Sequence, residues 1–293
     1  MENDIVSTTC SICSYPTFMC DCDSTWDYLF QNCIGKVDET KGVSYTSLNI
    51  STMTICFNFN QEVDLKLLYE KISKKMNINY NPMSKKSKVQ KKRGADSFYN
   101  SFDIKLTIVD YTCEPNVFSN VSIFIFPNGK VKTAGTKTVN SIKILTTEII
   151  ELLRFTEGVC KEPATLDVEN IKVQMICSDF KIKPIKPDPD GWCIKQENLK
   201  NILVKDYSLS ATFSTLSRYP GINLKIPSID NTSEQISLLI FRSGSIIITG
   251  AKKAKDVSHC YFFITNLICN YSAELFYYDI NEDIKQKKKK KTN

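Results

Sequence analysis

The segment 122–135, SIFIFPNGKVKTAG, returns later in the chain as 237–250, SLLIFRSGSIIITG. Phe126 and Phe241 are separated by 115 positions (241 − 126 = 115), and Gly129 and Gly244 have the same separation. This period is far too long for a solenoid, so it predicts two similar half-domains related by a pseudo-two-fold axis. Such an axis suits a partner that is itself nearly symmetric, for example duplex DNA.

The composition limits the classes of protein to which the chain can belong. The 293 residues are 42% hydrophobic and 24% charged, enough for one large domain or two small ones with a proper core. No run of about 18 apolar residues and no secretory signal occur, which predicts an intracellular protein without a membrane partner. The net charge of +6 favours an anionic partner. The single histidine, His259, excludes a multi-histidine metal site and argues against Ser-His or Cys-His catalysis.

The cysteines leave one question open. Twelve cysteines are scattered through the chain, and without a secretory signal most are expected to be reduced and buried. Four of them near the N-terminus have C-x2-C-x6-C-x-C spacing: Cys10, Cys13, Cys20 and Cys22. Four thiolates could hold a structural Zn²⁺, or these cysteines could stay reduced without metal. No other cofactor is expected.

The composition and the repeat divide the chain into four regions. A cysteine-rich extension covers 1–42, the first repeat 43–159 with a basic insert at 84–93, the second repeat 160–279, and a lysine-rich tail 280–293. The tail could be a nuclear-localisation signal or a phosphate-binding segment. It could equally be a run of charges exposed to solvent.

Hydrophobic periodicity predicts the same order of elements in both repeats. Each begins with a strand, continues with a helix and several strands, and ends with a helix. The expected helices cover 63–76, 138–154, 194–204 and 254–268. The expected strands cover 48–59, 104–110, 121–126 and 130–134, then 171–176, 210–213, 222–226, 235–241 and 245–250. This order predicts an α+β fold in which helices cover one face of a curved antiparallel sheet.

The strands of the repeated hairpins are apolar on both faces. Phe124 and Phe126 alternate with Ile123 and Ile125, and Leu239 and Phe241 alternate with Leu238 and Ile240. The helices can cover only one face, so the other face is either buried in a three-layer core or exposed to bind a ligand. Lysines flank the hairpins at positions 130, 132, 137, 252, 253 and 255. An apolar face with basic surroundings favours DNA, whose phosphates attract lysines and whose base steps accept apolar wedges.

These segments resemble the paired LIF-x-SGK-x-x-x-TGAK hairpins of the TATA-binding protein family. The second copy, LLIFRSGSIIITGAKK at 238–253, is close to that pattern, and the first, FIFPNGKVKTAGTK at 124–137, is looser. LNI at 48–50, ENI at 169–171, DLK at 64–66, YNP at 80–82 and YPG at 219–221 resemble further family segments in the family's order. The resemblance covers about 44–279 and implies a saddle of two repeats with helices on its convex face.

The resemblance also implies how DNA would be bound. In the family, two pairs of phenylalanines wedge into base steps of an AT-rich minor groove, and two asparagines contact base acceptors. By this resemblance Phe126, Phe241 and Tyr219 are wedges, and Phe102 or Phe98 is the fourth. Asn49 and Asn170 would donate to A N3 or T O2. Phe124 and Ala134 would line the groove in the first half, and Leu239, Ile247 and Thr249 in the second. Lysines near the phosphates would be Lys130, Lys132, Lys137, Lys172 and Lys252.

Several departures from the family pattern affect the expected function. Lys132 and Lys172 stand where the family has small apolar residues facing DNA, so strict TATA preference is in doubt. The loop 216–218 is short and lacks the acidic residues that receive TFIIB-like factors. The composition, rich in Lys, Asn and Ile, is similar to that of versions in large DNA viruses or fast-evolving protists.

The resemblance implies a non-enzymatic transcription initiation factor. It would bind and bend AT-rich promoter DNA and recruit a TFIIB-like factor and RNA polymerase. It would act in the nucleus or, in a virus, in the cytoplasmic virus factory or virion. The alternative is a protein-interaction module that keeps the saddle fold but has lost strict TATA recognition. No catalytic constellation is visible in the sequence, and no small-molecule substrate is expected.

Overall fold

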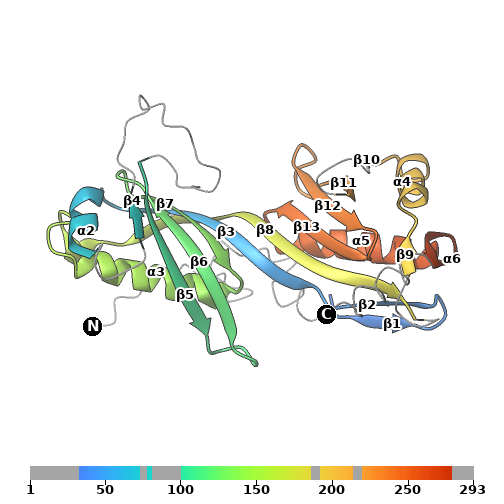
Figure 1. Ribbon diagram of the computed structural model, residues 1–293. Helices are drawn as coiled ribbons and strands as arrows, with labels where there is room; N and C mark the ends of the chain where they lie inside the picture. Colours follow the sequence, from blue (N-terminus) through green and yellow to red (C-terminus); the bar gives the residue numbers. More distant parts are fainter. Residues whose placement is uncertain (1–32, 73–77, 81–99, 186–191, 214–219, 279–293) are drawn as a thin grey trace, which may run out of the picture. The chain divides into compact units, whose positions relative to one another are not determined.

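The computed structural model describes residues 33–72, 78–80, 100–185, 192–213 and 220–278. They form two compact units (Figure 1). Unit 1 contains the described residues of Ser51–Met175, and unit 2 those of Asp21–Ile50 and Ile176–Asn293. This division differs from the predicted boundary after 159, because strands β3 and β8 each contribute residues to both units.

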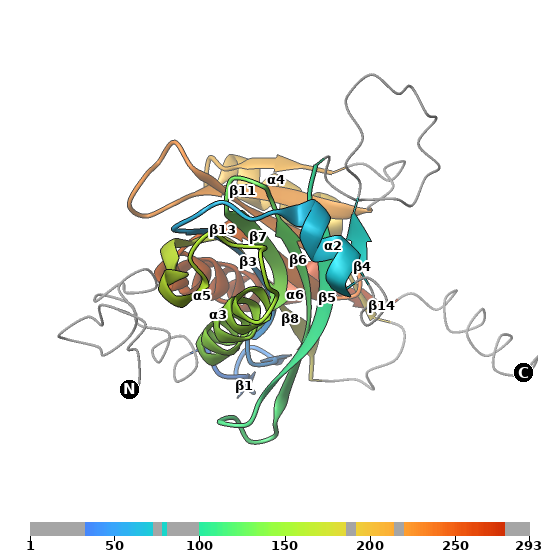
Figure 2. The same cartoon turned by 90° about the vertical axis from the view of Figure 1, so that its left-hand side faces the viewer.

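Unit 1 is an antiparallel sheet with helices. Its strand order is β3 (Asn49–Phe59), β7 (Lys130–Thr136), β6 (Val117–Ile125), β5 (Phe102–Asp110) and β4 (Ile78–Tyr80). The helical elements are α2 (Leu65–Ile72), α3 (Val139–Arg154) and the 3₁₀ turn η1 (Pro163–Thr165). Helix α3 packs on β5 and β7 (Figure 2) and buries Ile142, Leu145 and Ile149. One face of the sheet is therefore covered.

Unit 2 repeats this arrangement. Its strand order is β10 (Ser210–Thr212), β11 (Gly221–Pro227), β12 (Gln235–Phe241), β13 (Ser245–Ala251) and β8 (Val168–Pro184). The helices are α4 (Gln196–Lys205), α5 (Ala254–Asn270) and α6 (Ser272–Leu275). Strand β2 (Val43–Tyr45) pairs with β8 and with β1 (Lys36–Asp38), and β9 (Trp192–Ile194) pairs with β14 (Phe276–Tyr278). The shared strand order confirms the predicted α+β class.

The strand ladders show which residues of the two units are equivalent. Strand β7 carries one extra residue, Gly135, because Met53 pairs with Thr136 and Thr54 with Ala134. Strand β13 carries Gly250 in the same way, because Ile176 pairs with Ala251 and Cys177 with Thr249. Gly135 and Gly250 are 115 positions apart, so the same β-bulge is present in both units.

The short strands β1, β2, β4, β9 and β14 and the full length of β8 were not predicted. Strand β8 covers Val168–Pro184, whereas the sequence predicted only 171–176. Beyond 176 its polar residues, among them Ser178, Asp179, Lys181 and Lys183, interrupt the apolar pattern on which the prediction was based. Within the described part of the chain, no helix has the length and apolar character needed to cross a membrane.

The two bulge glycines provide a matched test of the fold. Both have positive φ, +121° at Gly135 and +93° at Gly250. A Cβ on Gly135 would lie 2.1 Å from the carbonyl oxygen of Asn120, whereas one on Gly250 would lie 3.5 Å from its nearest atom, the carbonyl oxygen of Gln235. Gly135→Ala should therefore lower the free energy of unfolding by about 2 kcal/mol more than Gly250→Ala. Urea unfolding of both variants would measure this difference, and equal losses would contradict it.

Candidate nucleic-acid interface

Unit 2 presents a partly exposed apolar face. Ile236, Leu238, Ile240, Ile246 and Ile248 are at most 1% exposed, and α5 packs on β13. The side chains that alternate with them are only partly buried. We call this side of the sheet the open face of unit 2, formed by Asp179, Asn223, Leu239, Phe241, Ile247 and Thr249. The prediction that β12 and β13 are apolar on both sides is therefore confirmed.

Unit 1 has the corresponding open face, but it carries more charge. It is formed by Cys56, Asn58, Asp103, Phe124, Phe126, Lys132 and Ala134, which are all partly exposed. One row of directly paired residues crosses the strands in the order Asp103, Phe124, Lys132, Cys56. The equivalent row of unit 2 is Asn223, Leu239, Ile247, Asp179. Lys132 thus lies within the face, at the position that Ile247 holds in unit 2.

A hollow of about 600 Å³ opens beside Phe126. Its lining includes Phe126, Lys130, Lys132 and Cys56, together with Asn58 and Asn100. Burial raises the pKa of the Cys56 thiol, although the nearby Lys132 ammonium lowers it in part. The hollow thus combines an aromatic ring with two ammonium groups and two amides. This chemistry favours a ligand that has both flat rings and anionic groups.

The ring of Phe241 rests on a glycine. Gly221 is paired directly with Phe241, and a Cβ on Gly221 would lie 3.2 Å from Cε1 of that ring. A larger residue would displace the ring, so Gly221 sets where Phe241 lies on the open face. Phe126 directly follows β6 and Phe241 is the last residue of β12, so each precedes its hairpin loop. Both residues are partly exposed.

The two candidate asparagines do not hold equivalent positions. Met53 and Ile176 are equivalent because they pair with Thr136 and Ala251 at the two bulges. Asn49 lies four positions before Met53, whereas Asn170 lies six positions before Ile176. The residue equivalent to Asn49 is Lys172. The prediction of a symmetric pair of amides is therefore wrong, because the similar motifs LNI and ENI stand at different distances from the bulge.

Each of these side chains also has a different setting from the one predicted. Asn49 Nδ2 donates to Asp179 Oδ1 at 3.0 Å, so its amide is engaged by a carboxylate of the open face. Asn170 is exposed and has φ +55°. Lys172, the residue equivalent to Asn49, is exposed as well.

Phe102 is not a wedge. Its side chain is 0% exposed and its ring centroid lies 6.3 Å from that of Tyr80. Phe102 pairs with Ile125 as Ile222 pairs with Ile240, so Phe102 is equivalent to the buried Ile222. This assignment is corrected: Phe102 belongs to the core, because strand alternation directs it away from the open face.

Tyr219 and Phe98, the other two aromatic residues predicted as wedges, lie outside the described residues, so their wedge roles stay predictions.

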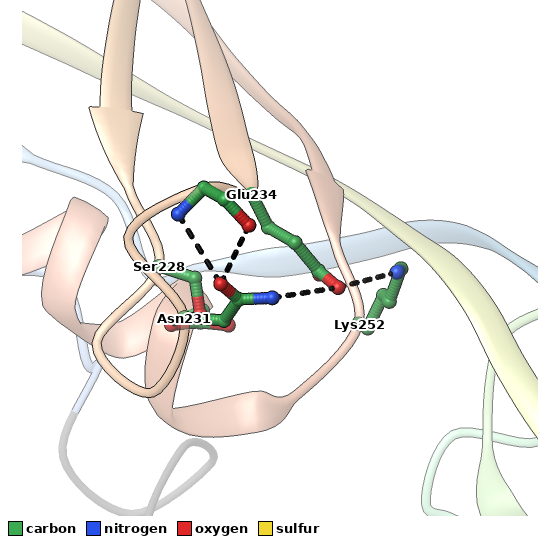
Figure 3. A network of polar contacts seen from close by, with 6 residues as sticks. Ser228, Asn231, Glu234 and Lys252 are labelled. Carbon is green, nitrogen blue, oxygen red and sulfur yellow. Dashed lines mark hydrogen bonds and ion pairs between the residues drawn. The ribbon is translucent and has the colours of Figure 1, made fainter.

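The predicted phosphate-binding lysines differ in their electrostatic setting. Lys252 Nζ lies 2.9 Å from Glu234 Oε1 (Figure 3). Asp230 pairs with Lys253 at 2.5 Å and with Lys255 at 2.7 Å. In unit 1, by contrast, neither Lys130 nor Lys137 forms an ion pair with any residue that the structure describes. The loop 228–234 therefore neutralises lysines of unit 2 that the sequence assigned to phosphate contact.

The candidate zinc ligands Cys10, Cys13, Cys20 and Cys22 lie outside the described residues, as do the basic insert 84–93 and the tail 280–293. Elsewhere, across the described ranges, no group of three or more His, Cys, Asp or Glu side chains could hold a metal ion. The remaining candidates, the open faces and their lysines, have the chemistry of a DNA contact surface.

Comparison with known proteins finds similarity to TATA-binding proteins. Residues 198–271, from α4 to the end of α5, match the family model described as "Transcription factor TFIID (or TATA-binding protein, TBP)". A "TATA-box-binding protein-like" protein of Acanthamoeba polyphaga mimivirus is 22% identical over 281 residues, covering 85% of this chain and 72% of the relative. The chain is therefore similar to TATA-binding proteins over residues 198–271 and to a viral protein of that description over most of its length. The solved structure of Methanococcus jannaschii TBP is also similar, with a TM-score of 0.47 and 19% identity over 75% of this chain and 97% of the archaeal chain.

Proposed function

We propose that this TATA-binding-protein-like chain binds AT-rich promoter DNA through the minor groove, bends it and nucleates assembly of an initiation complex. A DNA-binding role of this type is supported by the family match and by the viral relative. The observation that carries the proposal is the partly exposed apolar open face of each unit, with Phe126 and Phe241 at equivalent positions. Apolar side chains inserted at a base step unstack it and kink the duplex.

The proposed partners are duplex DNA, a TFIIB-like factor and RNA polymerase, and the proposed role is not enzymatic. The similarity to a mimivirus protein supports an origin in a large DNA virus, in which case the chain would act in the virus factory or virion.

A second candidate function is supported by the charged residues of the open faces. Asp103 and Lys132 in unit 1 and Asp179 in unit 2 interrupt surfaces that an AT-rich groove would meet with apolar groups. A protein segment with polar side chains could pair with them, so the alternative is a protein-interaction module that has lost strict TATA recognition.

One assay separates the two functions. Fluorescence energy transfer between the ends of a TATA-containing duplex would report bending, with a GC-rich duplex as the control and salt concentration as the variable. The proposed function predicts bending of the TATA duplex and an affinity that falls steeply with salt. If neither duplex binds at low salt, the protein-interaction function is favoured.

The ion pair at Lys252 leads to a prediction on affinity. Glu234→Gln should release the Lys252 ammonium for a phosphate, which should raise DNA affinity about 3-fold and steepen the salt slope by about one. Glu148→Gln is a matched control. Glu148 is exposed on α3, so this substitution removes the same charge at a place away from Lys252. Equal affinities for the two variants in a salt titration would show that Lys252 does not contact phosphate.

A further inference from the structure

A carboxylate lies on the proposed DNA-binding surface of unit 1, at one end of the row of paired residues. Asp103 on β5 is paired directly with Phe124, and Phe124 with Lys132. Directly paired residues have Cβ atoms about 5 Å apart on the same face of the sheet. Asp103 is also partly exposed. A ligand that contacts Phe124 therefore reaches Asp103 as well.

The surroundings of Asp103 leave its carboxylate able to accept a further hydrogen bond. Ser101 Oγ donates to Asp103 Oδ1 at 2.6 Å. A carboxylate has about four acceptor sites on its two oxygens, so a second donor can be accommodated. Burial raises the pKa of Asp103, and the hydrogen bond from Ser101 opposes that effect only in part. An additional donor would stabilise the ionised group.

The minor groove contains only one kind of base donor. An A·T pair presents the acceptors A N3 and T O2, and these would repel a carboxylate, whereas a G·C pair adds the N2 amino group of guanine. We propose that Asp103 selects a G·C pair at one position of the bound site by accepting a hydrogen bond from the guanine N2 amino group. This inference rests on the proposed function and specifies the DNA that unit 1 prefers.

The equivalent position of unit 2 has a different chemistry. Asn223 is paired with Leu239 as Asp103 is paired with Phe124. An asparagine amide can both donate and accept, so it does not exclude A·T. Asp179, the carboxylate of the unit 2 open face, accepts the hydrogen bond from Asn49 at 3.0 Å. The guanine preference is therefore assigned to the half of the site that unit 1 contacts.

Inosine tests this directly, because an I·C pair differs from G·C in the minor groove only by lacking the N2 amino group. In a series of AT-rich duplexes, each A·T pair is replaced in turn by G·C and by I·C, and the affinity of the full chain is measured. Wild type should bind the G·C duplex about 10-fold more tightly than the I·C duplex at one position. Asp103→Val should abolish that ratio, and Asp103→Asn, which keeps a carbonyl acceptor, should reduce it.

The controls distinguish failure of this inference from failure of the proposed function. Glu148→Gln removes a charge from the exposed side of α3 and should keep the ratio. Far-UV circular dichroism melts would confirm that the Asp103 variants fold. Bending of AT-rich duplexes with no position sensitive to inosine would overturn the inference alone. A ratio that survives Asp103→Val but is lost in Asp179→Asn would also overturn it. Absence of binding to every duplex would contradict the proposed function itself.

Discussion

Phe241→Ala is expected to abolish DNA bending and to weaken duplex binding at least about 30-fold. The ring lies on the open face, is partly exposed and is seated over Gly221, so its removal takes away a wedge without opening the core of unit 2. Energy transfer between the ends of a TATA-containing duplex would measure bending, and a filter or anisotropy titration would measure affinity. Phe126→Ala should have the same effect, because it holds the equivalent position in unit 1.

A matched phenylalanine controls for nonspecific loss of apolar surface. Phe155 is 87% exposed and forms the C-cap of α3, the helix that covers the other side of the unit 1 sheet. Phe155→Ala should leave bending and affinity unchanged. Bending that persists in Phe241→Ala would refute the wedge role and favour the protein-interaction function.

Asp110→Ala is expected to destabilise unit 1 by about 3 to 5 kcal/mol, the largest stability effect among these predictions. Asp110 is 0% exposed at the end of β5. Its carboxylate accepts hydrogen bonds from Thr112 N at 3.0 Å, Thr112 Oγ1 at 2.7 Å, Thr138 Oγ1 at 2.5 Å and Asn140 Nδ2 at 2.8 Å. Thr138 also caps α3 by accepting from Ser141 N at 3.0 Å. Loss of the carboxylate leaves these donors without their acceptor where β5 meets α3.

Urea unfolding would measure this loss. Asp110→Asn keeps the size of the side chain and one acceptor, so it should cost less than Asp110→Ala. Glu148→Ala removes a charge from an exposed position of α3 and should cost little. A cost for Asp110→Ala as small as that of Glu148→Ala would show that the network does not hold unit 1 together.

The same carboxylate makes stability depend on pH. Burial alone would raise the pKa of Asp110, but the hydrogen bonds from Thr112, Thr138 and Asn140 outweigh it and hold the pKa well below its ordinary value. The pKa in the folded chain thus lies below that in the unfolded chain, so the contribution is complete above the ordinary Asp value of about 4 and is lost as pH falls below it. The stability difference between wild type and Asp110→Asn should therefore shrink between pH 6 and pH 3.

Part of the candidate site was predictable from local patterns. The hairpin 122–135 and its repeat predicted that Phe124 and Phe126 share one face of their strand and that Leu239 and Phe241 share one face with Ile247, because residues two apart on a strand share a face. The two asparagines were assigned from the short motifs LNI and ENI, and motifs carry no information on distance from a bulge. Phe102 was one of two wedge candidates, and its burial follows from its place in the strand ladder. The ion pair of Lys252 with Glu234 joins residues of different strands, so no local pattern could indicate it.

The sequence by itself determined that one α+β unit occurs twice, since turn glycines and alternating apolar residues act over a few positions and are visible in the chain. Only the tertiary structure decided which side of each strand faces outward, which residues of the two units are equivalent and which lysines are already paired. Those properties follow from strand register and from contacts between distant segments. One extra residue at a β-bulge shifts the strand pairing by one position, which is enough to change the residues with which a motif is paired.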